Sequence, residues 1–201
     1  SGDLGFRFGH GSSNYVAIAL VHVADYAAFC QSAANLRAQR RLGAHYEYHY
    51  AHIPKSERAA YFTMLRDTDL AAWVLIADKR KLDLEWHNWY DAFRPLITNL
   101  AGRVPLEVLE NAILLIDEPD ARSETVKVIR VAFSIALRTR GARRGIRKAR
   151  GYPARREDGI QLADMIAGAV MEMETGADTR LLARLGDKVK VWWFEEETLG
   201  E

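Results

Sequence analysis

Runs of apolar residues that are closed by charged or turn-forming residues recur along the chain and predict β-strands. Three of them are nearly continuous, which is typical of strands buried on both faces. They cover residues 15–23 (YVAIALVHV), 72–79 (AWVLIADK) and 111–118 (NAILLIDE). Two further stretches alternate and also predict strands: 45–53 (HYEYHYAHI), and 187–194 (DKVKVWWF), which we expect at a sheet edge.

Apolar positions spaced three or four residues apart predict helices between these strands. Asp25 can cap the first helix. Pro95 should kink or divide the third, and Gly102 is placed to end it. The predicted helices cover residues 26–37, 54–66, 86–100, 121–138 and 158–175.

Strands and helices alternate along the chain, and no internal repeat, low-complexity tract or long linker interrupts them. This order predicts an α/β layered fold around a mixed sheet. A chain of 201 residues predicts one domain with a sizeable core. Residues 1–23 predict the tail of one strand, a turn and a second strand.

Composition narrows the class of protein without identifying an activity. Hydrophobic residues make up 49% of the chain and charged residues 27%, as in an ordinary globular protein. Cys30 is the only cysteine, which excludes a disulfide within the chain and favours a cytoplasmic setting. No apolar run approaches the ~20 residues of a membrane helix, so we expect no membrane partner. The first residues lack the features of a signal peptide and an initiator Met, so we expect residues to be missing in front of them.

Positive charge is concentrated in one segment of a chain whose formal net charge is only +1. Between residues 138 and 156 the sequence has nine basic residues and no acidic one. Such a segment on an otherwise acidic body predicts a phosphate-binding surface. Gly141, Gly145 and Gly151 interrupt it, so a solvated, mobile loop is the alternative, with a short strand expected near Ile146.

The helix predicted for 158–175 contains IQLADMIAGAV, an apolar stretch that carries a carboxylate. Helical spacing places its large apolar residues on one stripe and Gln161, Asp164 and Gly168 on another. A buried carboxylate is costly unless it is paired, protonated or bound to a metal, and a glycine lets a neighbouring group approach closely. We therefore expect the polar stripe to line a cleft, with a solvent-facing helix surface as the alternative.

Two other stretches place acidic side chains where a ligand could bind. Asp117 ends an apolar strand, and ligands of open α/β sheets bind at the carboxyl ends of strands; a simple turn is the alternative. In HYEYHYAH, side chains two residues apart share a strand face, so Glu47 lies between His45 and His49. A Glu with flanking His can ligate a transition metal or position a water. The spacing matches no zinc motif, and an aromatic edge strand with polar tips is the alternative.

Glu47, Asp117 and Asp164 thus each have a reason to face one site. Their oxygens suit Mg²⁺ or Mn²⁺, and several carboxylates in one place cannot all stay ionised without a cation. Two such ions ~4 Å apart would activate a water and stabilise the leaving oxygen of a phosphodiester. The basic segment leads directly into the helix that carries Asp164 and would bind the phosphates.

Five short motifs, in order along nearly the whole chain, resemble the family catalogued as domain of unknown function 3800, which is placed in the ribonuclease H-like superfamily. The last motif is the most specific, and the others gain weight from their order. The motifs are SGDLGF at 1–6, YEYH at 46–49, ADK at 77–79, LLIDE at 114–118 and IQLADMIAGAV at 160–170. The resemblance implies a single ribonuclease H-like domain over residues 1–201, with a central mixed sheet flanked by helices.

The resemblance also implies an acidic site of the two-metal nuclease type, with Glu47, Asp117 and Asp164 as the metal-binding carboxylates. Members of the family usually read Asp-Glu-Ser-Gly where this chain begins at Ser1, and that Asp, on the first strand, is a principal metal ligand. Asp3 lies past the motif position and does not replace it. We therefore expect either a truncated first strand or an incomplete site with weak metal binding and little activity.

These observations favour a divalent-metal-dependent nuclease, or a related phosphoryl-transfer enzyme, that acts on nucleic acid. In this hypothesis the three carboxylates hold Mg²⁺ or Mn²⁺, His49 orients the site and Lys79 offsets charge on the substrate. The residues expected to grip the nucleic-acid backbone are Arg143, Arg144, Arg147 and Lys148. Two alternatives on the same fold are a non-catalytic nucleic-acid-binding module and a protein-interaction component that exposes Trp192 and Trp193. Fold alone does not choose among them.

Overall fold

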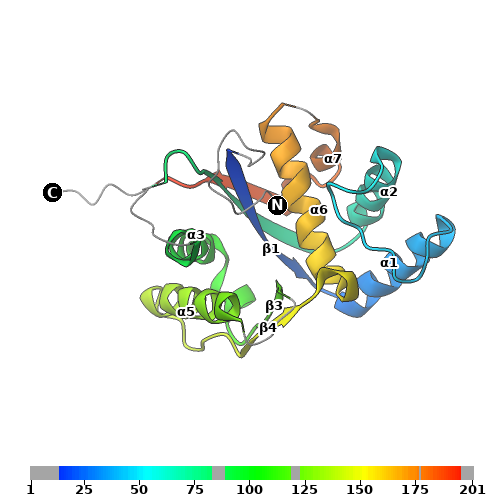
Figure 1. The fold of residues 1–201 in the computed structure, drawn as a ribbon. Coiled ribbons are helices and arrows are strands. Elements are labelled where there is room, and N and C mark those ends of the chain that lie inside the picture. The colour runs from blue at the N-terminus through cyan, green and yellow to red at the C-terminus, as the bar shows by residue number, and fades with distance from the viewer. Residues whose placement is uncertain (1–13, 83–88, 119–122, 177, 196–201) are drawn as a thin grey trace.

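The strands of the computed structural model, which describes residues 14–82, 89–118, 123–176 and 178–195, form two small sheets (Figure 1). Within these residues one sheet has the order β1-β2-β5, and the other pairs β3 with β4. β1 is antiparallel to β2, whereas the β2–β5 and β3–β4 pairs are parallel. The strands are β1 (Tyr15–Val23), β2 (Leu70–Asp78), β3 (Ile113–Asp117), β4 (Lys148–Tyr152) and β5 (Val189–Trp193).

The helices follow the spacing of apolar residues in the sequence. Asp25 caps α1, because its carboxylate accepts a hydrogen bond from the Ala28 N–H at 2.9 Å. Pro95 lies inside α3, which continues through Gly102, since Gly102 does not adopt the left-handed conformation that ends a helix. The longer helices are α1 (Tyr26–Gln39), α2 (Lys55–Arg66), α3 (Trp89–Arg103), α5 (Glu124–Thr139) and α6 (Asp158–Glu174). The short ones are α4 (Leu106–Leu109), η1 (Ala154–Arg156), α7 (Arg180–Ala183) and η2 (Gly186–Lys188).

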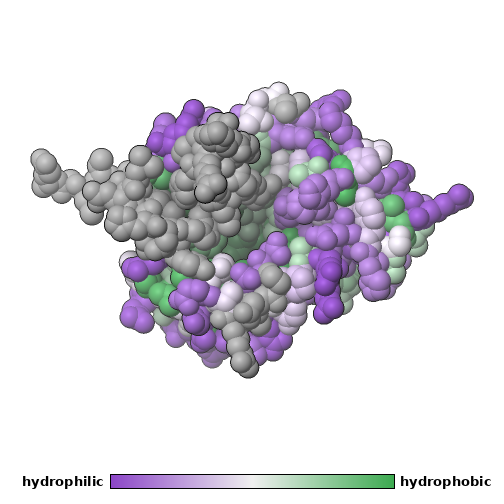
Figure 2. All heavy atoms as spheres, viewed as in Figure 1, coloured by the Kyte–Doolittle hydropathy of each residue, from purple (hydrophilic) through white to green (hydrophobic). Residues whose placement is uncertain are grey.

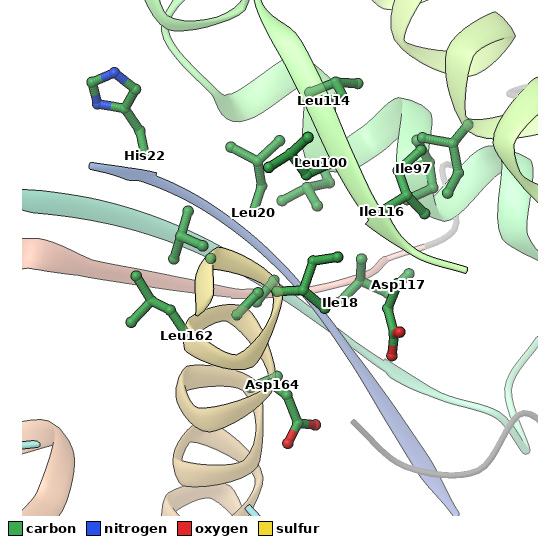
Figure 3. A pocket seen from close by; sticks show the side chains of 18 of the residues that line it. Ile18, Leu20, His22, Ile97, Leu100, Leu114, Ile116, Asp117, Leu162 and Asp164 are labelled. Atoms are coloured by element: carbon green, nitrogen blue, oxygen red, sulfur yellow. The ribbon is translucent and has the colours of Figure 1, made fainter. Parts of the chain in front are cut away.

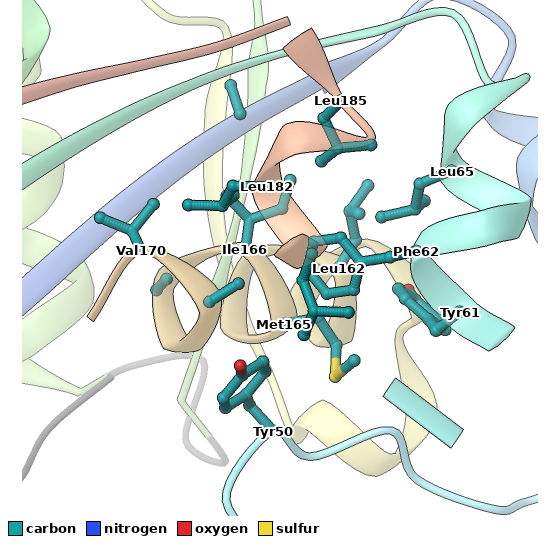
Figure 4. Close-up of a cluster of buried hydrophobic side chains, with 14 of the residues drawn as sticks. Tyr50, Tyr61, Phe62, Leu65, Leu162, Met165, Ile166, Val170, Leu182 and Leu185 are labelled. Carbon is teal, nitrogen blue, oxygen red and sulfur yellow. The ribbon is translucent and has the colours of Figure 1, made fainter. Parts of the chain in front are cut away.

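The side chains of β2 alternate between two hydrophobic cores, one on each face of the three-stranded sheet. Val74 and Ile76 belong to the core formed with α1, α2, α6 and α7, part of which is drawn in Figure 4. Trp73 and Leu75 belong to the core formed with α3 and α5. Burial on both faces is the reason that this strand reads as a continuous apolar run. The sheet is therefore the middle of three layers, as the ribbon in Figure 1 shows.

The three continuous apolar runs are confirmed as β1, β2 and β3, and the late alternating run is confirmed as β5 at a sheet edge. The basic segment is not a loop throughout. It contains β4, which begins two residues after the buried Ile146. The SGDLGF motif and Trp86 lie outside the described residues. In the part of the chain that is described, no helix has the length and hydrophobicity to cross a membrane.

The strand expected at 45–53 is wrong, because this stretch is an irregular segment that lies against α6. The backbone N–H groups of Tyr48 and Tyr50 donate to the side chains of Gln161 and Asp164, so they are not available to a neighbouring strand. Both tyrosine side chains are buried, which accounts for the alternating aromatic pattern without a sheet.

Candidate functional site

A cleft with a volume of about 640 Å³ lies between β1 and β3, the facing edges of the two sheets (Figure 3). α6 and α3 contribute further apolar walls. Figure 2 shows a hydrophobic hollow near the centre of this face, with hydrophilic side chains along its right-hand side. We refer to it as the β1–β3 cleft and define it by Ile18, Leu20, Ile97, Leu100, Leu114, Ile116, Asp117, Leu162 and Asp164.

Two carboxylates, Asp117 and Asp164, lie at one end of this apolar cleft (Figure 3). Asp117 ends β3, and Asp164 projects from the middle of α6. Burial raises the pKa of Asp117, and the negative charges of Asp164 and Glu47 raise it further. A hydrogen bond from the backbone of Ala154 and the nearby His49 act in the opposite direction. The structure therefore brings Glu47, Asp164 and His49 within electrostatic reach of Asp117.

The segment that carries Glu47 and His49 is fixed to α6 by two hydrogen bonds. The Tyr48 N–H donates to Gln161 Oε1 at 2.9 Å, and the Tyr50 N–H donates to Asp164 Oδ2 at 2.8 Å. Gln161 is buried and also donates from Nε2 to the Ala154 carbonyl at 2.9 Å. One glutamine thus links the 45–50 segment to the turn whose N–H donates to Asp117.

Gly168, the third member of the polar stripe on α6, is where the Tyr50 ring packs. A Cβ at this position would lie 2.2 Å from Tyr50 Cγ, which no real contact allows. The prediction that the glycine permits a close approach is therefore confirmed, and the approaching group is Tyr50. Tyr50 is held from its other side as well, because its hydroxyl donates to Glu172 at 2.6 Å and Arg58 lies over its ring. The stripe thus faces the 45–50 segment, and Asp164 also borders the β1–β3 cleft.

His49 points a nitrogen at Asp164. Its Nδ1 lies 3.7 Å from Asp164 Oδ2, is buried, and makes no hydrogen bond to any described residue. A buried polar atom without a hydrogen-bond partner is uncommon in folded proteins. The His49 and His52 rings stack at 4.2 Å, which holds the orientation of the imidazole.

The carboxylate and imidazole side chains at this end of the cleft match the usual ligands of a hard divalent cation only in part. Among the described residues, no group of three or more His, Cys, Asp or Glu side chains is arranged to hold a metal ion. Mg²⁺, however, is usually bound by one or two carboxylates together with water and substrate phosphates. Asp117 and Asp164 supply two carboxylates at the same end of the cleft, and the negative charge of Asp164 adds to the burial that raises the pKa of Asp117.

The four basic residues predicted to bind nucleic acid lie at different distances from the end of the cleft that carries Asp117 and Asp164. Tyr152 pairs with Asp117 and Lys148 with Ile113, so Lys148 lies at the opposite end of β3. Arg143 and Arg144 lie further in that direction, where their backbone N–H groups donate to Glu110. Arg147 precedes β4, and all four side chains are exposed.

Lys79 follows β2 and is fully buried, so the structure does not present it at the surface. Arg140, also in the basic segment, donates to the carbonyls of Ala101 and Val104 and so stabilises the end of α3. The charge pattern of the sequence alone does not distinguish Lys79 and Arg140 from exposed basic residues that could face a substrate.

Several residues near the acidic end were not identified by the sequence pattern. Arg150 is exposed, and its guanidinium donates to the hydroxyl of Tyr152. Tyr152 is the residue that pairs with Asp117 in the β3–β4 register. Arg155 and Arg156 are exposed and follow directly after Ala154. The sequence did point to these three arginines as basic residues, since all three belong to the basic segment. Only the β3–β4 register shows which part of the run lies near the carboxylates.

Comparisons of the chain with models of known protein families, with curated proteins and with solved structures found no match.

Proposed function

We propose that the protein is a divalent-metal-dependent nuclease, or a related phosphoryl-transfer enzyme, that acts on nucleic acid through a ribonuclease H-like fold in a cytoplasmic setting. The observation that carries the proposal is the meeting of Asp117 and Asp164 at one end of the β1–β3 cleft, with Glu47 and His49 within electrostatic reach. The ordered motifs that resemble domain of unknown function 3800 support the same site.

In this proposal Asp117 and Asp164 hold Mg²⁺ or Mn²⁺, and Glu47 adds negative charge beside them. A cation bound there would supply an activated water and stabilise charge on phosphate oxygens. Asp164 accepts from the Tyr50 N–H through Oδ2, and its Oδ1 takes no part in that hydrogen bond. His49 orients the site through Nδ1, which faces that carboxylate.

Exposed cations provide a path for the phosphates of the substrate toward the acidic end. Arg150 pairs with Leu115, two residues before Asp117, and Arg155 and Arg156 follow Tyr152, which pairs with Asp117. Arg147 and Lys148 extend the positive surface toward the other end of β3. Contacts of this kind bind the nucleic-acid backbone without reading sequence. Binding should therefore weaken steeply with salt, because each neutralised phosphate releases counterions.

The test is a nuclease assay on single- and double-stranded DNA and RNA with Mg²⁺, with Mn²⁺ and with EDTA. Asp164→Asn is the informative variant, since its amide oxygen can still accept from Tyr50 while the charge is lost. Asp164→Ala removes both the charge and the hydrogen bond, and Asp187→Asn changes an exposed carboxylate on η2 as a control. We expect metal-dependent cleavage that falls at least 100-fold in Asp117→Asn and Asp164→Asn and is unchanged in Asp187→Asn. Equal activity in all variants would refute the proposed site.

A non-catalytic nucleic-acid-binding module is the second candidate. It is favoured by the lack, among the described residues, of a three-residue group that could hold a metal. This alternative predicts binding that survives EDTA and the Asp164→Asn substitution, together with no cleavage under any metal condition.

A further inference from the structure

The two-stranded sheet has one covered face and one exposed face. β3 and β4 are parallel neighbours (Figure 1), so residues that pair across them point to the same face. Leu114 and Ile116 point to one face, where they pack against the core formed with α3 and α5. Ile113 and Leu115 alternate with them and point to the opposite face, where they are 41% and 37% exposed. We refer to this opposite face as the β3–β4 platform, which is formed by Ile113, Leu115, Asp117, Lys148, Arg150 and Tyr152.

The β3–β4 platform carries two parallel rows of different chemistry. The row on β3 is apolar until the strand ends at Asp117. In the row on β4, Lys148 and Arg150 are exposed cations and Tyr152 is a half-buried aromatic residue. The Arg150 guanidinium donates to the Tyr152 hydroxyl at 3.2 Å, which agrees with their position on one face and places the cation beside the ring. One row thus offers apolar surface, and the other offers positive charge and an aromatic ring.

This combination of rows favours a single strand of nucleic acid over a duplex. In a duplex the bases are stacked inside and the phosphates lie outside, so a duplex would contact the cations and leave Ile113 and Leu115 without a partner. A single strand exposes its bases, which stack on aromatic side chains while the backbone follows a positively charged surface. Paired strands lie ~4.8 Å apart, so both rows of the platform can contact the same nucleic-acid strand.

We propose that the β3–β4 platform binds single-stranded nucleic acid, with a base stacked on Tyr152 and the phosphates on Lys148 and Arg150. The other bases pack against the apolar row of β3. The inference rests on the proposed action on nucleic acid and adds the form of the substrate. The two rows end together, because Tyr152 pairs with Asp117. A strand that lies along the platform is therefore led to the acidic end of the β1–β3 cleft.

Fluorescence anisotropy in EDTA tests the proposal on the full chain and measures binding without metal-dependent cleavage. The probes are a deoxythymidine dodecamer, a uridine dodecamer and a DNA duplex of the same length. We expect Tyr152→Leu, which keeps apolar bulk but removes the ring, to weaken binding of the tighter single-stranded probe at least fivefold. Leu115→Ser should weaken it as well, and both variants should change the affinity for the duplex less than twofold.

Val131→Ser is the matched control, because it replaces an exposed apolar residue on α5 and should leave every affinity unchanged. Three results would overturn the proposal: no binding of either single-stranded probe by the wild type, unchanged binding in both platform variants, or an equal loss of affinity for single strands and duplex.

Photocrosslinking provides a second test that requires no substitution in the protein. A 5-iodouracil base within the dodecamer crosslinks on irradiation to an aromatic side chain stacked against it. We expect the crosslinked peptide to contain Tyr152 and not Trp193, an exposed aromatic residue on β5. Crosslinks that lie only outside residues 148–152 would overturn the proposal.

Failure of this inference is distinguishable from failure of the proposed function. Single-strand binding that depends on Tyr152, with no cleavage under any metal condition, would refute the nuclease activity and leave the platform in place. Metal-dependent cleavage, with single-strand binding unchanged in Tyr152→Leu and Leu115→Ser, would refute the platform and leave the nuclease activity in place.

Discussion

Substitution of Gly168 by alanine should destabilise the protein even though alanine favours helix. The new Cβ would lie 2.2 Å from Cγ, 2.4 Å from Cδ1 and 2.6 Å from Cβ of Tyr50. Tyr50 cannot simply turn away, because its ring is covered by Arg58 and its hydroxyl is bonded to Glu172. Overpacking of this kind costs typically 1–3 kcal/mol, and the close approach to a fixed ring places the cost near ~3 kcal/mol. The gain in helix propensity returns up to ~1 kcal/mol, so we expect a net loss of about 2 kcal/mol.

Gly102→Ala is the matched control, since Gly102 lies in α3 and a Cβ there meets nothing within 4 Å. It should stabilise the protein by up to ~1 kcal/mol. Urea unfolding followed by the fluorescence of tryptophan, including the buried Trp73, measures both variants. The two free energies of unfolding should differ by about 3 kcal/mol. If Gly168→Ala is as stable as Gly102→Ala, the close packing of Tyr50 on α6 does not exist in solution.

Two further predictions concern the polar groups around this contact. Gln161→Leu should lower the free energy of unfolding by ~2–4 kcal/mol, because it leaves the buried Tyr48 N–H without its acceptor and removes one of the three acceptors of the Arg37 guanidinium; a change below ~0.5 kcal/mol in urea unfolding would contradict this. Because the pKa of Asp117 is raised in the folded state, stability should fall as the pH rises from the ordinary carboxyl pKa through the raised one. Asp117→Asn should abolish that fall, and parallel pH profiles for the two proteins would show that Asp117 does not titrate as inferred.

The strands and helices could be predicted well where one physical cause dominates. β2 is buried on both faces, and its continuous apolar run follows directly from that. The strand prediction for residues 45–53 was wrong because burial against a helix also produces an alternating aromatic pattern. Periodicity records which side chains are buried but not which partner accepts the backbone hydrogen bonds. The partner here is a pair of side chains more than 110 residues away in the sequence.

The sequence could predict which residues belong to the candidate site but not how they are arranged in space. Asp117 was found because it ends an apolar run, and Asp164 because it interrupts one. The order of basic residues could not show that Arg150 pairs with Leu115, two residues before Asp117, while Arg143 lies beyond the other end of β3, because that depends on the β3–β4 register. The sequence also could not show that Lys79 is buried, since charged residues that follow a strand are usually exposed.

The polar stripe on α6 shows how one aspartate could both position the 45–50 segment, which the structure shows, and bind the proposed metal. Gln161 and Asp164 are three residues apart, ~4.5 Å along the helix, and they accept from the N–H groups of Tyr48 and Tyr50, which are two residues apart in sequence. α6 therefore aligns the 45–50 segment along itself. That alignment requires one carboxylate oxygen of Asp164 and keeps its side chain at the end of the β1–β3 cleft. Asp164→Asn, which removes the charge but keeps the acceptor, therefore separates the proposed metal binding from the positioning of the 45–50 segment, whereas Asp164→Ala would change both at once.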